Sequence, residues 1–264
     1  MTTFINLVFI LCLVPFSVFA YPSETPDNPL SNKKKIPITV AISDVGYYPF
    51  SYIENGEVRG FSIDILHYVE NNSKYEFKFI TMPWPRALHF VSIGKADLIL
   101  ALFSTAKREK IYHLIEPTYG QEVIQLFTLV ESEIKFNGPL QQLIPYSIGT
   151  LREYSYGEAF DKADYLEKLP ASTEALLLKL LLGKRIDIAI SNAPTFNKLI
   201  LKENLSAKIK AIEPYITLKP VHMALTKNRK DAHEIKQTLS QLIQLLKTSP
   251  YYQELLEKYQ MNYK

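Results

Sequence analysis

One short pattern occurs twice in this chain, and this repeat is the strongest constraint on its fold. Residues 94–97 (GKAD) lead directly into the apolar run 98–102, and residues 183–187 (GKRID) lead into a similar run at 188–190. Each copy follows an apolar segment with helical spacing, so helix, tight turn and buried strand come in the same order. A strand that is apolar at every position suits a parallel sheet covered by helices. The copies are too far apart for a solenoid, so they predict two similar α/β lobes.

Further segments extend this alternation of strands and helices. Residues 38–42 are rich in β-forming side chains, and Asn55-Gly56 between two short apolar runs predicts a tight hairpin turn. Residues 75–79 alternate apolar and charged side chains, as in a half-buried strand. A helix is expected over 85–93, closed by Gly94, and further helices are expected to be capped or opened by Ser62, Asp231 and Pro250.

One apolar run and one later segment are candidates for the connections between the lobes. Residues 123–130 can carry the chain from the first lobe to the second, and residues 220–225 can carry it back. The predicted organisation is therefore a first lobe over 36–130, a second lobe over 131–219, and a return to the first lobe over 220–264. Two lobes with two crossings form a hinged cleft, a common location for a small-ligand site.

The first twenty residues predict export. They contain no charged side chain, are apolar from Phe4 to Val14, and end in the small residue Ala20. This pattern is typical of a signal peptide cleaved after Ala20; a retained anchor is the alternative, although the apolar core is shorter than the roughly 20 residues that span a bilayer. Residues 21–35 then have the composition of a linker. The only cysteine, Cys12, lies in the leader, so the mature protein is expected to contain none.

Charge and motifs exclude several classes of function. Thirty basic and twenty-seven acidic side chains give a net charge of +3, with no concentrated basic tract of the kind that binds nucleic acid. Motifs for a nucleophile, a zinc site or a phosphate loop are absent, and the five histidines are scattered. We therefore expect no nucleic-acid partner, no catalytic residue, no metal and no cofactor.

The best binding signal is Arg108, at the start of a short helix. Ser104 or Thr105 can cap that helix directly after a buried strand, and Arg108 lies one turn in. A guanidinium beside the free N–H groups of a first turn forms a site for a carboxylate. The alternative is a surface arginine that pairs with Glu109 or Glu116. In the second lobe, residues 152–156 again predict a strand leading into a helix start, and they would face the first site.

Aromatic side chains cluster near these turns. Tyr47, Tyr48 and Phe50 follow the first strand, Trp84 lies between two prolines, and Phe103 precedes the capped turn. Each alone is more often a core residue, but together they can form a wall that stacks a ring or holds a cation. Asp44, in the loop before Tyr47, can pair with a ligand amine or simply cap its turn.

The order of these segments resembles that of the family 3 extracellular solute-binding proteins. The matching stretches are 47–52, Asn55-Gly56, 60–64, 84–88, 94–97, 105–109 and 183–187. The resemblance covers residues 38–259 and implies a two-lobed fold of the type II periplasmic-binding-protein class with two hinge crossings. It also implies that Arg108 anchors a ligand carboxylate, that Tyr47 or Tyr48 stacks on the ligand, and that Tyr154 and Ser155 are the contribution of the second lobe.

The chain departs from the family pattern at several site positions. Asn192 stands where amino-acid binders commonly have an acid that pairs with the α-ammonium. Ala101 and Phe103 replace residues that are often Ser or Thr, and Glu153 replaces a usual glycine. A ligand ammonium would then need Asp44 or an aromatic face as its partner.

The resemblance implies a function as a periplasmic, monomeric solute-binding protein. Such a protein captures a small carboxylate-bearing solute, an amino acid or a related compound, and delivers it to an inner-membrane permease of the ABC type. One alternative is an enzyme like the cyclohexadienyl dehydratases, with Glu153 as an acid that points into the cleft beside the arginine. The other alternative is a sensor or accessory binding protein.

Overall fold

The computed structural model describes residues 34–261. The predicted signal peptide and residues 21–33 of the predicted linker lie outside these residues. The first half contains β1 (Ile36–Ser43), β2 (Tyr52–Glu54), β3 (Glu57–Arg59), α1 (Phe61–Asn71), β4 (Tyr75–Met82), α2 (Trp84–Ser92), β5 (Leu98–Leu102), α3 (Ala106–Ile111), β6 (Tyr112–Leu114) and β7 (Gly120–Leu129). The second half contains η1 (Leu140–Leu143), β8 (Ile148–Leu151), α4 (Glu158–Asp161), β9 (Lys168–Ala171), α5 (Glu174–Leu182), β10 (Ile188–Asn192), α6 (Ala193–Lys202), β11 (Ile209–Thr226), α7 (Ala232–Lys247) and α8 (Pro250–Lys258).

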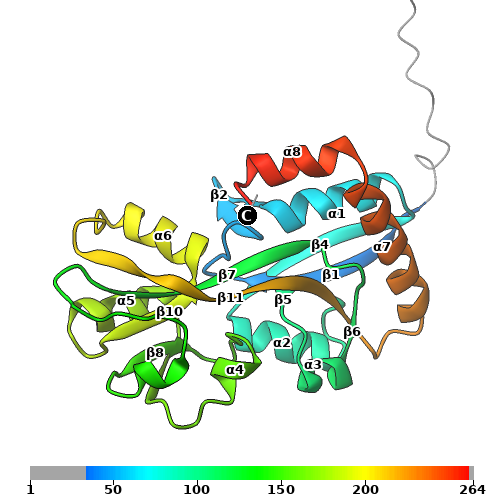
Figure 1. Ribbon diagram of the computed structural model, residues 1–264. Coiled ribbons are helices and arrows are strands. Elements are labelled where there is room, and N and C mark those ends of the chain that lie inside the picture. Colours follow the sequence, from blue (N-terminus) through cyan, green and yellow to red (C-terminus); the bar gives the residue numbers. More distant parts are fainter. Residues whose placement is uncertain (1–33, 262–264) are drawn as a thin grey trace, which may run out of the picture. The chain divides into compact units, whose positions relative to one another are not determined.

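One mixed sheet runs through both lobes (Figure 1). Its order is β4-β1-β5-β11-β7-β10-β8-β9, and β6 also pairs with β11. The predicted buried strands are parallel to their neighbours within each lobe: β1 lies parallel to β4 and β5, and β8 lies parallel to β9 and β10. All five residues of β5 and of β10 are buried, as the apolar runs predicted. The predicted α/β architecture is confirmed.

Helices cover the apolar faces of the sheet. In the first lobe, α1, α7 and α8 lie on one face, and α2 and α3 lie on the other (Figure 1). The α2 face has its own core around Ala87, Val91 and Ile99. In the second lobe, α5 and α6 pack on β7 and β10 around Phe127 and Phe196, whose ring centroids are 4.8 Å apart. Among the described residues, no helix is both long enough and apolar enough to cross a membrane.

The lobes are joined by β7 and β11, the two long strands near the middle of Figure 1. These strands are antiparallel to each other, with a shift in register between Ile212 and Thr217. Residues 124–127 of β7 also pair with β10 in the second lobe, and residues 222–226 of β11 pair with β5 and β6 in the first. The predicted crossing runs lie largely or wholly in these strands. The lobe boundaries at 130 and 219 stay a prediction, because the sheet is continuous across the crossings.

The local turn predictions have mixed outcomes. Asn55 and Gly56 both have positive φ, 53° and 81°, as a tight hairpin turn between β2 and β3 requires. Gly94 closes α2 with a φ of 74°. The prediction that Ser62 caps α1 is wrong. That helix begins after Gly60, and Ser62 lies inside it with its hydroxyl 2.8 Å from the hydroxyl of Tyr119.

Gly60 fixes the loop that carries the first-lobe aromatics against the start of α1. The N–H groups of Phe61 and Ser62 donate to the carbonyls of Pro49 and Phe50 at 2.8 and 2.9 Å. This close approach leaves no room for a side chain, since a Cβ at Gly60 would lie 2.3 Å from the Phe50 carbonyl oxygen. Gly60 also has a φ of 135°, which side-chain-bearing residues rarely adopt.

Replacing Gly60 with alanine is therefore expected to lower the free energy of unfolding by about 2 to 4 kcal/mol. The matched control is Gly138→Ala. Gly138 also has a positive φ, 116°, but nothing lies within 4 Å of its Cβ position. The control should lose about 1 kcal/mol, from backbone strain alone. Urea unfolding measures both, and equal losses would show that the contact with Phe50 adds nothing.

Candidate functional site

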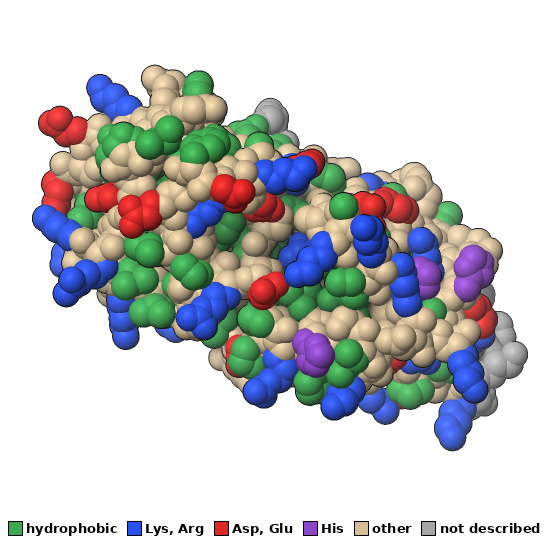
Figure 2. All heavy atoms as spheres, turned by 90° about the horizontal axis from the view of Figure 1, so that it is seen from below, with side chains coloured by type: hydrophobic (Ala, Val, Ile, Leu, Met, Phe, Trp, Pro, Cys, Tyr) green, Lys and Arg blue, Asp and Glu red, His purple; other side chains and the backbone are tan. Residues whose placement is uncertain are grey.

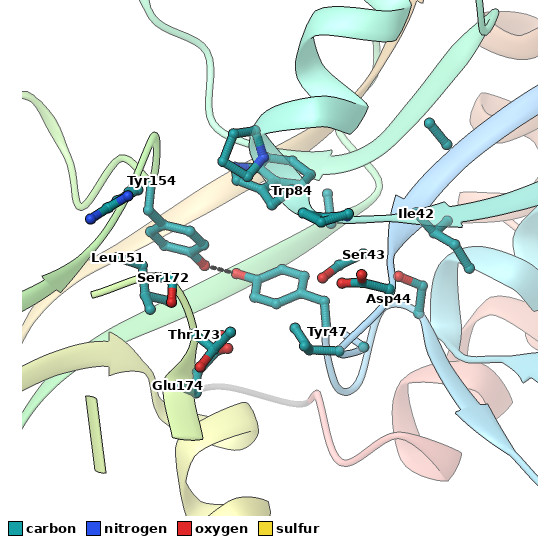
Figure 3. Close-up of a pocket in the computed structure, with 18 of the residues that line it drawn as sticks. Ile42, Ser43, Asp44, Tyr47, Trp84, Leu151, Tyr154, Ser172, Thr173 and Glu174 are labelled. Carbon is teal, nitrogen blue, oxygen red and sulfur yellow. Dashed lines mark hydrogen bonds between the residues drawn. The ribbon is translucent and has the colours of Figure 1, made fainter. Parts of the chain in front are cut away.

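A cavity of about 250 Å³ lies between the two lobes. Figure 2 shows a hollow near the middle of the lower face, with acidic and basic side chains around it. The close-up in Figure 3 shows that Ser43, Asp44, Tyr47 and Trp84 reach the cavity from the first lobe, and that Leu151, Tyr154, Ser172, Thr173 and Glu174 reach it from the second. Most of these residues follow the carboxyl ends of parallel strands, where ligands bind in open α/β sheets.

Two predicted residues, Tyr47 and Tyr154, contact a buried carboxyl that the sequence did not indicate. A third, Asn192, lies close to it. Glu122, on β7, is 2% exposed. Both the Tyr47 and the Tyr154 hydroxyls contact its Oε1 atom, and the two hydroxyls also contact each other, as the dashed line in Figure 3 marks. Asn192, at the end of β10, is 1% exposed and lies close enough for its side chain to lower the pKa of Glu122. A first-lobe loop, a crossing strand and a second-lobe loop therefore converge on one carboxyl group.

Burial sets the acidity of this cluster. It raises the pKa of Glu122 to about 7, against lowering effects from the Tyr154, Tyr47 and Asn192 side chains and from Arg108. Burial and the carboxyl charge together raise the pKa values of the Tyr47 and Tyr154 hydroxyls well above their ordinary value. Near neutral pH, Glu122 therefore exchanges a proton while both tyrosines stay neutral.

Arg108 lies in a second pocket, on the other side of Tyr154. Of the two predicted caps of α3, Ser104 and Thr105, the structure shows Thr105, whose Oγ1 accepts the N–H of Arg108 at 3.2 Å. The guanidinium donates to the carbonyl of Phe103 at 3.0 Å and to that of Glu153, in the other lobe, at 3.3 Å. Burial lowers the pKa of Arg108. Thr105, Arg108, Tyr154 and Ser155 line this outer pocket of about 470 Å³, and only Tyr154 of these also lines the inner cavity.

The second-lobe segment differs from its prediction. Residues 152–156 do not begin a helix; α4 starts only at Glu158, and Glu153 has a φ of 58°, in the left-handed region that favours glycine. Ser155 donates to Asp161 at 2.5 Å, and the N–H of Tyr156 donates to the same carboxylate at 2.9 Å. These two bonds hold Tyr154 and Ser155 in place without a helix.

Glu153 does not have the geometry that the dehydratase alternative requires. Its side chain is exposed, and its backbone carbonyl, not its carboxylate, accepts hydrogen bonds from Arg108 and from Trp84 Nε1, each at 3.3 Å. Glu153 therefore meets the arginine with its backbone carbonyl and not with its carboxylate.

Three predicted ligand residues line neither the inner cavity nor the outer pocket. Tyr48 lies outside both, where the ammonium of Lys198 lies 4.1 Å from its ring centroid. Phe103 is a core residue, 3% exposed, and contributes only its carbonyl. Asn192 caps α6 by accepting the N–H of Thr195 at 2.9 Å, and its Nδ2 has no hydrogen-bond partner among the described residues.

Residues 38–262 match the model of the bacterial extracellular solute-binding proteins, family 3. The chain belongs to this family. No curated protein sequence matches it significantly.

Solved structures show the same fold at low identity. A histidine kinase sensor domain similar to periplasmic binding proteins is 18% identical over 86% of this chain and 96% of its own, with a TM-score of 0.73. The amino acid ABC transporter substrate-binding protein AbpA from Streptococcus pneumoniae, bound to L-arginine, is 18% identical over 84% and 94%, with a TM-score of 0.69. An ancestral amino-acid-binding protein, AncCDT-1, a precursor of cyclohexadienyl dehydratase, is 17% identical over 84% and 94%, also with 0.69. The predicted family and two-lobed fold are confirmed.

The acidic groups of this site differ from those expected from the family resemblance. The acid expected at position 192 is absent, while Glu122 lies two residues before Ile124, the register partner of Asn192. Glu174, at the start of α5, lines the cavity as well, and burial raises its pKa. The one sequence signal for Glu122 was its place next to the apolar run 123–130, where a charged residue is unusual. Among the described residues, no group of three His, Cys, Asp or Glu side chains could hold a metal ion.

Asn192→Asp is expected to destabilise the protein in a pH-dependent way. The new carboxyl would lie beside Glu122 without a cation, so the loss should be about 2 to 4 kcal/mol near pH 8 and smaller near pH 5, where both groups hold protons. Asn192→Ala is the control, because it removes the α6 cap without adding charge and should cost about 1 kcal/mol at both pH values. Urea unfolding at the two pH values gives the comparison; equal losses for Asp would show that the two carboxyls do not interact.

Proposed function

We propose that this protein captures a small carboxylate-bearing solute, an amino acid or a related compound, between its lobes and delivers it to an ABC-type permease. The observation that carries the proposal is the position of Arg108. Its guanidinium is partly buried at the meeting of the lobes, and its only hydrogen bonds within residues 34–261 go to two carbonyl oxygens. Neither contact neutralises its charge. A carboxylate that enters the outer pocket offers a bidentate, charged partner in place of those carbonyls.

The inner cavity suits the rest of such a solute. Trp84, Tyr47 and Tyr154 provide aromatic faces, and the carboxylates of Asp44 and Glu174 provide acceptors for an amine. Because Tyr154 separates this cavity from Arg108, a solute that reaches both has its carboxylate on the outer side and its amine or apolar part on the inner side. An amine recognised in this way needs no acid at position 192.

Solute binding is coupled to closure of the cleft. The outer pocket takes Thr105 and Arg108 from the first lobe and Ser155 from the second, so a solute bound there contacts both lobes. A ligand that contacts both lobes stabilises the closed form relative to the open one. The closed form of a monomer would then be the form that the permease recognises.

A sensory role is the second candidate. The histidine kinase sensor domain has the same fold with a TM-score of 0.73, so the same cleft can report a solute to a signalling partner instead of a transporter. A precursor of cyclohexadienyl dehydratase also shares the fold, with a TM-score of 0.69, but Glu153, the acid that the dehydratase alternative invokes, is exposed.

Arg108→Ala is expected to weaken solute binding by about 2 to 5 kcal/mol, because a desolvated carboxylate loses its partner. Arg108→Lys should restore only part of this loss, since an ammonium cannot make the two-pronged contact. The solute is first identified by native mass spectrometry of protein purified without denaturation, and calorimetric titration then compares the variants. Lys107→Ala is the control, as Lys107 is an exposed cation on the same helix. Equal affinity of wild type and Arg108→Ala would contradict the carboxylate site.

Export to the periplasm is part of the proposal. The exported protein is expected to begin at Tyr21, because the uncharged apolar leader ends at Ala20. Intact-mass measurement of protein from the periplasmic fraction tests this. Recovery of the chain in the membrane fraction with residues 1–20 attached would show a retained anchor instead.

A further inference from the structure

The contacts of Glu122 tie the two lobes together at the crossing. Tyr47 comes from the loop after β1, Tyr154 from the loop after β8, and Glu122 from β7, which belongs to both lobes. The two tyrosine rings meet edge to face, with centroids 6.0 Å apart and planes at 68°. Figure 3 shows the two hydroxyls pointing at each other across the cavity. Opening the cleft must separate them.

The three contacts of this cluster need one more proton than the two tyrosines supply. Three oxygen atoms make three mutual contacts: Tyr47 with Glu122, Tyr154 with Glu122, and Tyr47 with Tyr154. Two neutral tyrosines supply two protons, so an ionised carboxylate leaves one contact without a hydrogen. A protonated Glu122 supplies the third, and the ring of three hydrogen bonds is then complete.

No neighbouring cation compensates an ionised Glu122. None of the ion pairs among the described residues includes it. Arg108, on α3, acts on it only at longer range, and Asn192, on β10, is neutral. Lys219 is its register partner on β11, but the Lys219 ammonium lies beside Gly157. Glu174, on α5, adds negative charge near Tyr47. An ionised Glu122 in the closed cleft is therefore a buried charge with two hydrogen-bond donors and no counter-ion.

We propose that Glu122 is a positioning residue whose protonation holds the cleft closed: with its proton it locks Tyr47 to Tyr154, and without it the lobes separate so that water reaches the carboxylate. This inference rests on the proposed function only in that the cleft opens and closes. It requires neither a carboxylate solute nor Arg108.

The direction of the pH dependence follows from the two forms of Glu122. In the closed form burial holds its pKa at about 7, whereas a solvated carboxyl in the open form has the ordinary value of 4.5. The closed form thus binds the proton more tightly. Closure is most favoured at a pH below 4.5, the ordinary pKa of the carboxyl, and is lost as the pH rises through 7. Over this range the ratio of closed to open protein falls by at most roughly 300-fold. Acid closes the empty cleft and mild alkali opens it.

The chain carries its own reporter for this experiment. Trp84 is its only tryptophan, it lines the cavity, and its Nε1 donates to the Glu153 carbonyl across the cleft. In the protein without solute, opening should expose Trp84, so its emission should shift to the red and iodide should quench it more strongly. Both signals are titrated between about pH 5 and about pH 9, and the radius of gyration from X-ray scattering at the two ends provides an independent measure of opening.

Three variants decide the assignment. Glu122→Gln removes the titrating group without introducing a charge, so the transition near neutral pH should vanish and the cleft should stay closed. Tyr154→Phe removes two of the three contacts of the ring, so the lock is lost and the empty cleft should be open at both ends of the pH range. Glu174→Gln removes the other cavity carboxyl whose pKa burial raises, and the transition should keep its midpoint.

Several outcomes would overturn the inference. These are a wild-type cleft that does not open between the two pH values, a transition that persists in Glu122→Gln, and one that disappears in Glu174→Gln. Because all these measurements use protein without solute, they are independent of the Arg108 titration, and either proposal can fail while the other stands.

Discussion

Both lobes depend on the antiparallel pairing of β7 with β11. These strands pair with each other on both sides of the register shift at 212–217, and each then adds a strand of one lobe at its free edge. Backbone groups in the middle of the sheet are therefore satisfied by the two crossing strands on either side of this shift. The cleft exists because the sheet is continuous while the helices and loops above it belong to different lobes. A residue on β7 can for this reason act on both lobes at once.

Glu122 is such a residue, and its position gives the cleft an unusual electrostatic division. Asp44, Glu174 and Glu122 lie in or next to the inner cavity, whereas Arg108 lies beyond Tyr154 in the outer pocket. In a low-dielectric cleft such a separation of charges orients a dipolar solute more strongly than it would in water. It also makes the empty closed form depend on hydrogen bonds within the protein, since the tyrosine hydroxyls and the arginine all find partners in the chain itself.

Two of the departures from the family pattern are explained by particular contacts. Glu153 occupies a left-handed position that favours glycine, and its carbonyl is what Arg108 and Trp84 bind. Asn192 caps α6 through its carbonyl oxygen, a role that an aspartate would also fill. What an aspartate would change is the charge beside Glu122. The neutral amide at 192 and the acid at 122 are therefore best understood as one linked arrangement.

The amino-acid sequence by itself determined the alternation of strands and helices in the first lobe, a cap at Ser104 or Thr105, the hairpin turn at Asn55-Gly56, and the family, because these follow from local spacing and turn chemistry. It also placed Asp44, Tyr47, Trp84 and Tyr154 at strand ends, where the cavity lies. It did not predict that Ser62 lies inside its helix, that Tyr48 faces Lys198, or that Arg108 has a pocket of its own. Only the tertiary structure decided these, and only it brought Glu122 between two tyrosines that are 107 residues apart in the chain. The physical reason is that burial and proton sharing depend on which segments meet across the cleft. The spacing of residues along one strand does not determine which distant segment packs against it.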